Sequence, residues 1–154
     1  MSQAAVPIVL TQPLPGAPTA GLRPLLLTAA ERRICRGRRE ATGGQPVVLQ
    51  LPRGVELHPG MVLADAAGTP QVVVEAAPEP LLVVSAADGL ALLQAAYHLG
   101  NRHVALELHA DQLRLLADSV LEAMLRQRGL QLQSVVAPFQ PEGGAYGGHA
   151  HQHP

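Results

Sequence analysis

Short apolar runs rich in valine and leucine recur through the first half of the chain. They occupy residues 46–51, 61–65 and 71–76, and glycine or proline follows each of them closely. Short strands at such a spacing, bounded by turn residues, are typical of a small all-β unit. We therefore predict an all-β domain over residues 1–78. Its proline-rich start, about the first 20 residues, is expected to be partly mobile.

The pattern changes to a helical period in the second half of the chain. An apolar run at residues 81–84 predicts a strand. The segment 86–99 follows, in which Leu90, Leu93 and Tyr97 recur at the spacing of an amphipathic helix. A strand that leads into a helix is thus expected at the start of a second domain.

Both ends of this predicted helix carry sequence signals. Ser85 and Asp88 have the spacing of a capping box at the start of the helix. At the other end, Gly100 and Asn101 are residue types that tolerate the left-handed conformation with which helices end. We therefore expect His103 at a helix-to-strand corner, with a fixed backbone and an outward-facing ring.

The remaining elements complete a recognisable order. The pattern predicts a strand at 104–109, its hairpin partner at 112–116, a helix at 120–128 and a last strand at 130–136. Ser119 and Glu122 have the spacing of a second capping box. Strand, helix, strand, strand, helix, strand is the ferredoxin-like arrangement. The predicted fold class is α+β: the all-β domain, a ferredoxin-like domain over residues 79–138, and a flexible histidine-containing tail over residues 139–154.

Composition excludes several classes of function. The 154-residue chain has a formal net charge of −1, whereas nucleic-acid binding needs a concentrated basic face, so we expect no nucleic-acid partner. Cys35 is the only cysteine, which excludes an intrachain disulfide and a cysteine-based zinc site. No run approaches the ~20 apolar residues that cross a bilayer, so we expect a cytoplasmic protein without membrane contact. Carboxylates occur singly and no phosphate-binding glycine loop is present, so we do not expect an enzyme.

Two groups of histidines carry the candidate chemistry. His103 lies at the predicted corner, and His149, His151 and His153 alternate in the glycine-rich tail. Neutral imidazole suits Ni(II), Zn(II) and Cu(II). A tail loses conformational entropy when it closes around an ion, so it binds weakly by itself, and a fixed His103 gives it a second point of attachment.

Each histidine also has an ordinary interpretation. Taken alone, His103 is more often a structural or surface residue, because nothing next to it in sequence supplies a second ligand. We interpret His98 as a packing or hydrogen-bonding residue, His109 as solvated at a strand end, and His58 as a surface residue of a turn.

Several motifs are shared with one known family. They are Tyr97-His98-Leu99-Gly100-Asn101-Arg102-His103-Val104, Met124-Leu125-Arg126-Gln127, Pro138-Phe139-Gln140-Pro141-Glu142 and the histidine tail. On these motifs the chain resembles the UreE family of urease accessory proteins, which are nickel metallochaperones. The resemblance runs from about Leu27 to the end of the chain.

The resemblance implies a homodimer that carries Ni(II) as its cargo and delivers it to the urease apoprotein during assembly of the urease active site. It places the corner histidine of each chain at the dimer centre, and tail histidines complete the coordination. The implied metal ligands are His103, His151 and His153, with His149 as a third tail donor. The implied partners are the urease apoprotein and the GTPase of the urease assembly machinery. The first domain is expected to be similar to a peptide-binding module.

Two alternatives remain open. One is a protein-interaction or co-chaperone module in which the histidines are incidental. The other is a general Zn(II) or Cu(II) buffer, since both ions accept the same ligands. Some relatives carry extra histidines between the hairpin and the second helix, but Leu115–Ser119 has none, which favours few ions per dimer.

Coordination by imidazole predicts a pH dependence. A histidine must be neutral to bind a metal ion, and an ordinary imidazole gains its proton near a pH of about 6.5. We expect nickel affinity to fall as the pH drops through this value. Nickel titrations at pH 7.5 and pH 5.5 check this, and equal affinities at the two would refute histidine coordination.

Overall fold

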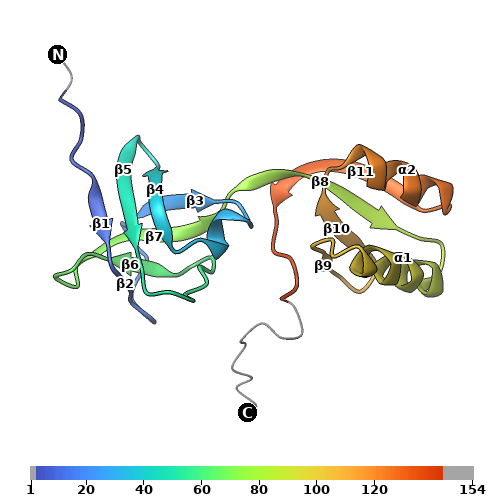
Figure 1. Cartoon of the computed structure of the whole chain (residues 1–154), viewed down its shortest axis with the longest axis horizontal. Coiled ribbons are helices and arrows are strands. Elements are labelled where there is room, and N and C mark those ends of the chain that lie inside the picture. The colour runs from blue at the N-terminus through green and yellow to red at the C-terminus, as the bar shows by residue number, and fades with distance from the viewer. Residues whose placement is uncertain (1–2, 144–154) are drawn as a thin grey trace, which may run out of the picture. The chain divides into compact units, whose positions relative to one another are not determined.

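The computed structural model describes residues 3–143. The chain divides into two compact units, Met1–Pro78 and Glu79–Pro154, and each has its own hydrophobic core. Figure 1 shows strands in both units, and among the described residues both α-helices belong to the second unit. The fold class is therefore α+β, as predicted.

In its described residues, the first unit has seven short strands and one 3-10 turn, η1 (Glu31–Arg33). The strands are β1 (Ile8–Leu10), β2 (Gln12–Pro13), β3 (Arg23–Leu27), β4 (Arg36–Ala41), β5 (Gln45–Gln50), β6 (Val62–Ala64) and β7 (Pro70–Ala76). They form two sheets, with strand orders β1-β5-β4 and β2-β6-β7-β3. β1 and β2 belong to these two sheets, and Leu10 of β1 is fully buried.

Leucine and valine supply the core of the first unit. Its fully buried members include Leu10, Leu25, Leu27, Leu51, Leu63, Val72 and Val74. Gly43 and Gly44, between β4 and β5, both have a positive φ, which glycine adopts without a Cβ penalty. In the β6–β7 turn, hydrogen bonds from the Thr69 backbone and the Gln71 side chain lower the pKa of Asp65.

The second unit contains the predicted order of elements. They are β8 (Pro78–Ser85), α1 (Gly89–Asn101), β9 (Glu107–Leu108), β10 (Leu113–Leu116), α2 (Ser119–Gln127) and β11 (Gln131–Pro138). The sheet has the strand order β11-β8-β10-β9, so β11 and β9 are its two edges. β10 is antiparallel to both of its neighbours. The strand predicted at 104–109 is only two residues long, because β9 pairs with β10 only through Glu107 and Leu108.

Aspartates cap both helices, and the predicted capping boxes are wrong. Asp88 is the N-cap of α1 and accepts a hydrogen bond from the Ala91 backbone at 2.8 Å, so the helix begins at Gly89 and not at residue 86. Asp118 caps α2 by accepting from the backbone N–H groups of Val120 and Leu121. In each helix a single aspartate therefore accepts the free N-terminal N–H groups, at the positive end of the helix dipole, and no Ser–acid pair is needed.

Candidate metal centre

His103 is the only described non-glycine residue with a positive φ, at +58°. It follows Arg102, the C-cap of α1. The His103 N–H donates to the Gly100 carbonyl at 3.0 Å, and the Val104 N–H donates to the Leu99 carbonyl at 3.1 Å. These two hydrogen bonds form a Schellman motif with histidine at the left-handed position. The sequence-based assignment of that conformation to Gly100 and Asn101 is wrong, because α1 continues through both.

The second helix ends in the same way with the residue that this geometry favours. Gly129 follows the C-cap of α2 and has a φ of +78°. Its N–H donates to the Arg126 carbonyl at 3.0 Å, and the Leu130 N–H donates to the Leu125 carbonyl at 3.2 Å. Glycine reaches the left-handed region freely, whereas an L side chain costs about 1–2 kcal/mol there.

The corner backbone is fixed and the histidine is exposed. Leu99 is fully buried, and Val104 packs against the same core, so both residues of the 3.1 Å hydrogen bond are anchored. His103 itself is exposed. A strained backbone conformation that persists beside an exposed ligand-type side chain points to a functional constraint at this position.

An exposed apolar stripe on α1 leads to this corner. Leu90, Leu93 and Tyr97 are 64%, 69% and 66% exposed, although they recur on one face of the helix. The face that packs on the core is built from Ala95 and Leu99. Three large apolar side chains on one helix face are typical of an interaction surface.

The other histidines of the described chain have local partners. His98 contacts the Tyr97 ring edge-to-face, with the ring centroids 5.4 Å apart, which agrees with a packing role. His109 is exposed, as expected, and its Nε2 also lies 2.7 Å from Oε1 of Glu107. His58 is exposed and lies 4.0 Å from Glu56.

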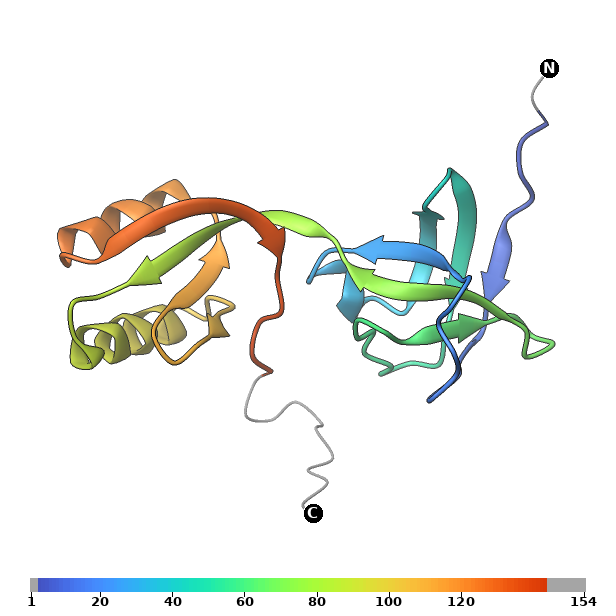
Figure 2. The ribbon, with the colours of Figure 1, turned by 180° about the vertical axis from the view of Figure 1, so that it is seen from behind.

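Residues 139–142, the first residues of the segment predicted as a tail, make contacts with the second unit. Figure 2 shows the chain turning sharply away from the end of β11. Phe139 is fully buried. The Gln140 N–H donates to Oε2 of Glu107 at 2.9 Å, and the Glu142 N–H donates to the Leu106 carbonyl at 2.7 Å.

Sequence reasoning missed the role of Glu107. A single carboxylate in the apolar run 104–108 was the available signal, because a partly buried charge needs a hydrogen-bonding partner. Here both carboxylate oxygens are hydrogen-bonded.

The predicted ligands are only partly within the described chain. Among residues 3–143, no three His, Cys, Asp or Glu side chains lie close enough together to hold a metal ion. His149, His151 and His153 lie outside the described residues. His103 is thus the one predicted ligand whose setting the structure describes.

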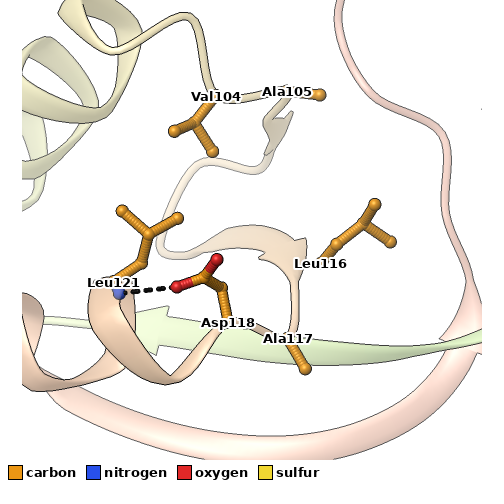
Figure 3. A pocket seen from close by; sticks show the side chains of 6 residues that line it. All are labelled: Val104, Ala105, Leu116, Ala117, Asp118 and Leu121. Atoms are coloured by element: carbon orange, nitrogen blue, oxygen red, sulfur yellow. Dashed lines mark hydrogen bonds between the residues drawn. The ribbon is translucent and has the colours of Figure 1, made fainter.

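A small apolar pocket of about 320 Å³ lies beside the corner (Figure 3). It is lined by Val104, Ala105, Leu116, Ala117, Asp118 and Leu121. The one carboxylate that lines it, Asp118, already accepts the N-terminal hydrogen bonds of α2. The pocket therefore brings together no set of acid, base and nucleophile.

None of the helices in the described part of the chain is long and apolar enough to cross a membrane.

Comparison with known proteins matches both parts of the chain. Residues 79–154 match the family model described as UreE urease accessory protein, C-terminal domain. A urease accessory protein UreE of Parasynechococcus marenigrum (strain WH8102) is 61% identical over 127 residues, which cover 82% of this chain and 85% of the relative. The protein of the same name from Synechococcus sp. (strain WH7805) is 62% identical, over 80% of this chain and 71% of the relative.

A more distant relative, the UreE of Nostoc punctiforme (strain ATCC 29133 / PCC 73102), is still 48% identical over 84% of this chain and 87% of its own length. Identity at this level over most of both chains leaves no room for a different fold or class. The chain belongs to the UreE family of urease accessory proteins and is an accessory chaperone, not an enzyme.

Proposed function

We propose that this protein is a dimeric nickel carrier that delivers Ni(II) to the urease apoprotein while the urease active site is assembled. The relatives are named urease accessory proteins, which supports a role in urease maturation. The observation that carries the nickel site is His103: an exposed imidazole in a strained, well-anchored corner at the end of an exposed apolar stripe.

The proposed dimer forms through the second unit, whose ferredoxin-like arrangement presents α1. Pairing two copies of the stripe Leu90–Leu93–Tyr97 about a twofold axis removes apolar surface from water. The same axis brings the two His103 residues towards each other, because each stripe leads to its own corner. A symmetric site with one rigid imidazole from each protomer follows.

Tail histidines complete the proposed site. His149, His151 and His153 of either protomer add ligands to the His103 pair. A set of two rigid and several tethered ligands suits transfer, since the tethered ligands exchange one at a time with those of the acceptor. Zn(II) and Cu(II) accept the same ligands, and Cu(II) binds more tightly in the usual order. Nickel selectivity in the cell therefore depends on metal supply and on the partner.

The proposed partners are the urease apoprotein and the GTPase of the assembly machinery, in the cytoplasm. The two-sheet first unit is proposed to bind a segment of one of them. This assignment follows the family and gives the first unit a task separate from metal binding.

Nickel calorimetry on the wild type and on His103→Ala tests the carrier function. We expect one tight Ni(II) per wild-type dimer, and loss of that tight site in the variant. His58→Ala is the matched control, because it removes an exposed histidine from the first unit and should leave binding unchanged. Tight binding that survives in His103→Ala would instead support a tail-only metal buffer. No binding by the wild type would support an interaction module.

A further inference from the structure

The histidine tail does not leave the second unit where the last strand ends. β11 ends at Pro138 on one edge of the sheet, whereas the next hydrogen bonds of the chain are made to residues 106 and 107, at the opposite edge beside β9. β11 and β9 are separated by three strand spacings, which is about 14 Å. Residues 139–142 therefore carry the chain from one edge of the sheet to the other.

The Glu107 carboxylate is the side chain that bonds the backbone of this crossing, which the buried Phe139 and the hydrogen bond of Glu142 also hold. Oε2 of Glu107 accepts from the Gln140 N–H at 2.9 Å, and Oε1 lies 2.7 Å from Nε2 of His109. The Glu107 side chain is only 15% exposed, whereas the His109 side chain is 41% exposed, and both hydrogen bonds lie at the surface. Arg114 on β10 is the cross-strand neighbour of Glu107, and this pairing of opposite charges is favourable. We call the His109–Glu107–Gln140 arrangement the Glu107 clamp.

We propose that the Glu107 clamp is a positioning device that starts the histidine tail beside the metal corner. This inference rests on the proposed nickel site and adds a residue to it that binds no metal itself. Glu142, which follows the clamp, is bonded to Leu106, and Leu106 is three residues from His103, a span of at most about 10 Å. Gln140 and Glu142 thus bring the tail to the side of the sheet where the corner lies.

The number of residues between the last anchored residue and the tail histidines affects how often those histidines reach the corner. His149 and His153 follow Glu142 by seven and eleven residues, whereas they follow Pro138 by eleven and fifteen. The local concentration of a tethered ligand falls with the −3/2 power of tether length and also with the distance to be spanned. By tether length alone, starting the tether at Pro138 instead of Glu142 lowers the local concentration at the corner about twofold for His149 and about 1.6-fold for His153.

Nickel titration of Glu107→Ala tests the clamp in the full-length chain. We expect an affinity weaker by up to about twofold for each tail that takes part, and so by up to about fourfold when both tails do, with the number of ions per dimer unchanged. Glu107→Gln should bind nickel like the wild type, because its amide oxygen still accepts from Gln140. Glu122→Ala is the matched control: it removes a carboxylate that bonds Arg126 at 3.0 Å in the same unit without touching residues 139–142.

Two further measurements separate positioning from other roles. In a chain with His149, His151 and His153 all replaced by alanine, adding Glu107→Ala should change nickel affinity no further. Amide hydrogen exchange at Gln140 should be faster in Glu107→Ala than in the wild type or in Glu122→Ala. These results together would support the proposal.

Three outcomes would overturn it. They are an unchanged nickel affinity in Glu107→Ala, an equal loss in the background without tail histidines, or a Glu107→Gln variant as weak as the alanine one. The second would make Glu107 or His109 a direct ligand, and the third would make the charge itself the cause. Failure of the carrier proposal is a different result. In that case the wild type would bind no nickel, or His103→Ala would keep its tight site.

Discussion

Replacing His103 with glycine is expected to abolish tight nickel binding and, at the same time, to make the protein more stable. The φ of +58° at this position is costly for an L residue and free for glycine. After allowance for the greater freedom of glycine in the unfolded chain, we expect the free energy of unfolding to rise by roughly 0.5–1 kcal/mol. Denaturant unfolding measures this, and a melting temperature higher by about 2–4 °C should accompany it.

The chain provides its own matched control in Gly129. It occupies the same position of the same motif at the end of α2, and nothing lies within 4 Å of where its Cβ would be. Gly129→His should therefore lower the free energy of unfolding by a similar amount, through backbone conformation alone, and leave nickel binding intact. A His103→Gly variant less stable than the wild type would show that the imidazole makes stabilising contacts, and the strain argument would fail.

A charge in the middle of the α1 stripe is expected to separate the dimer. Leu93 is 69% exposed in the single chain, and burying one leucine contributes about 1.5–3 kcal/mol. Twofold symmetry removes this contribution twice, so Leu93→Glu should cost about 4 kcal/mol of association, or roughly three orders of magnitude in the dimer dissociation constant. Analytical ultracentrifugation across a concentration series measures this directly.

The nickel site should disappear with the dimer, because each protomer supplies only one corner imidazole. Val120→Glu is the control: Val120 is 68% exposed, but it lies at the start of α2 and away from the stripe. This control should remain dimeric and bind nickel. A Leu93→Glu protein that stays dimeric would exclude α1 from the interface, and a monomer that still binds nickel tightly would exclude the shared site.

The kinds of element and their order could be predicted because each depends on local pattern. A short valine-rich run at residues 71–76 and a helical period in residues 86–99 are visible in the sequence, and β7 and α1 are found there. The helix starts could not be placed correctly in the same way. Ser85 and Asp88 both lie near the start of α1, but Ser85 is the last residue of β8. Asp88 is therefore the residue that caps the helix.

The two apolar faces of α1 show what the local sequence pattern could not predict, namely which face of the helix is buried. Leu90, Leu93 and Tyr97 define one stripe and Ala95 and Leu99 another, and hydrophobicity alone does not tell which of the two is buried. The structure buries Ala95 and Leu99 and leaves Leu90, Leu93 and Tyr97 exposed. The rotation of the helix about its axis is set by its attachment to β8 and by close packing on the sheet.

The α+β class, the order of elements in the second unit and His103 as the candidate ligand could all be predicted before the fold was known. Those predictions rest on residue periodicity and on side-chain chemistry, which are local. The folded chain was needed to show that His103 has the left-handed conformation, that the stripe Leu90–Leu93–Tyr97 is exposed, and that Glu107 bonds Gln140 from the far edge of the sheet. Each of these depends on residues brought together by packing, and no spacing along the chain encodes that proximity.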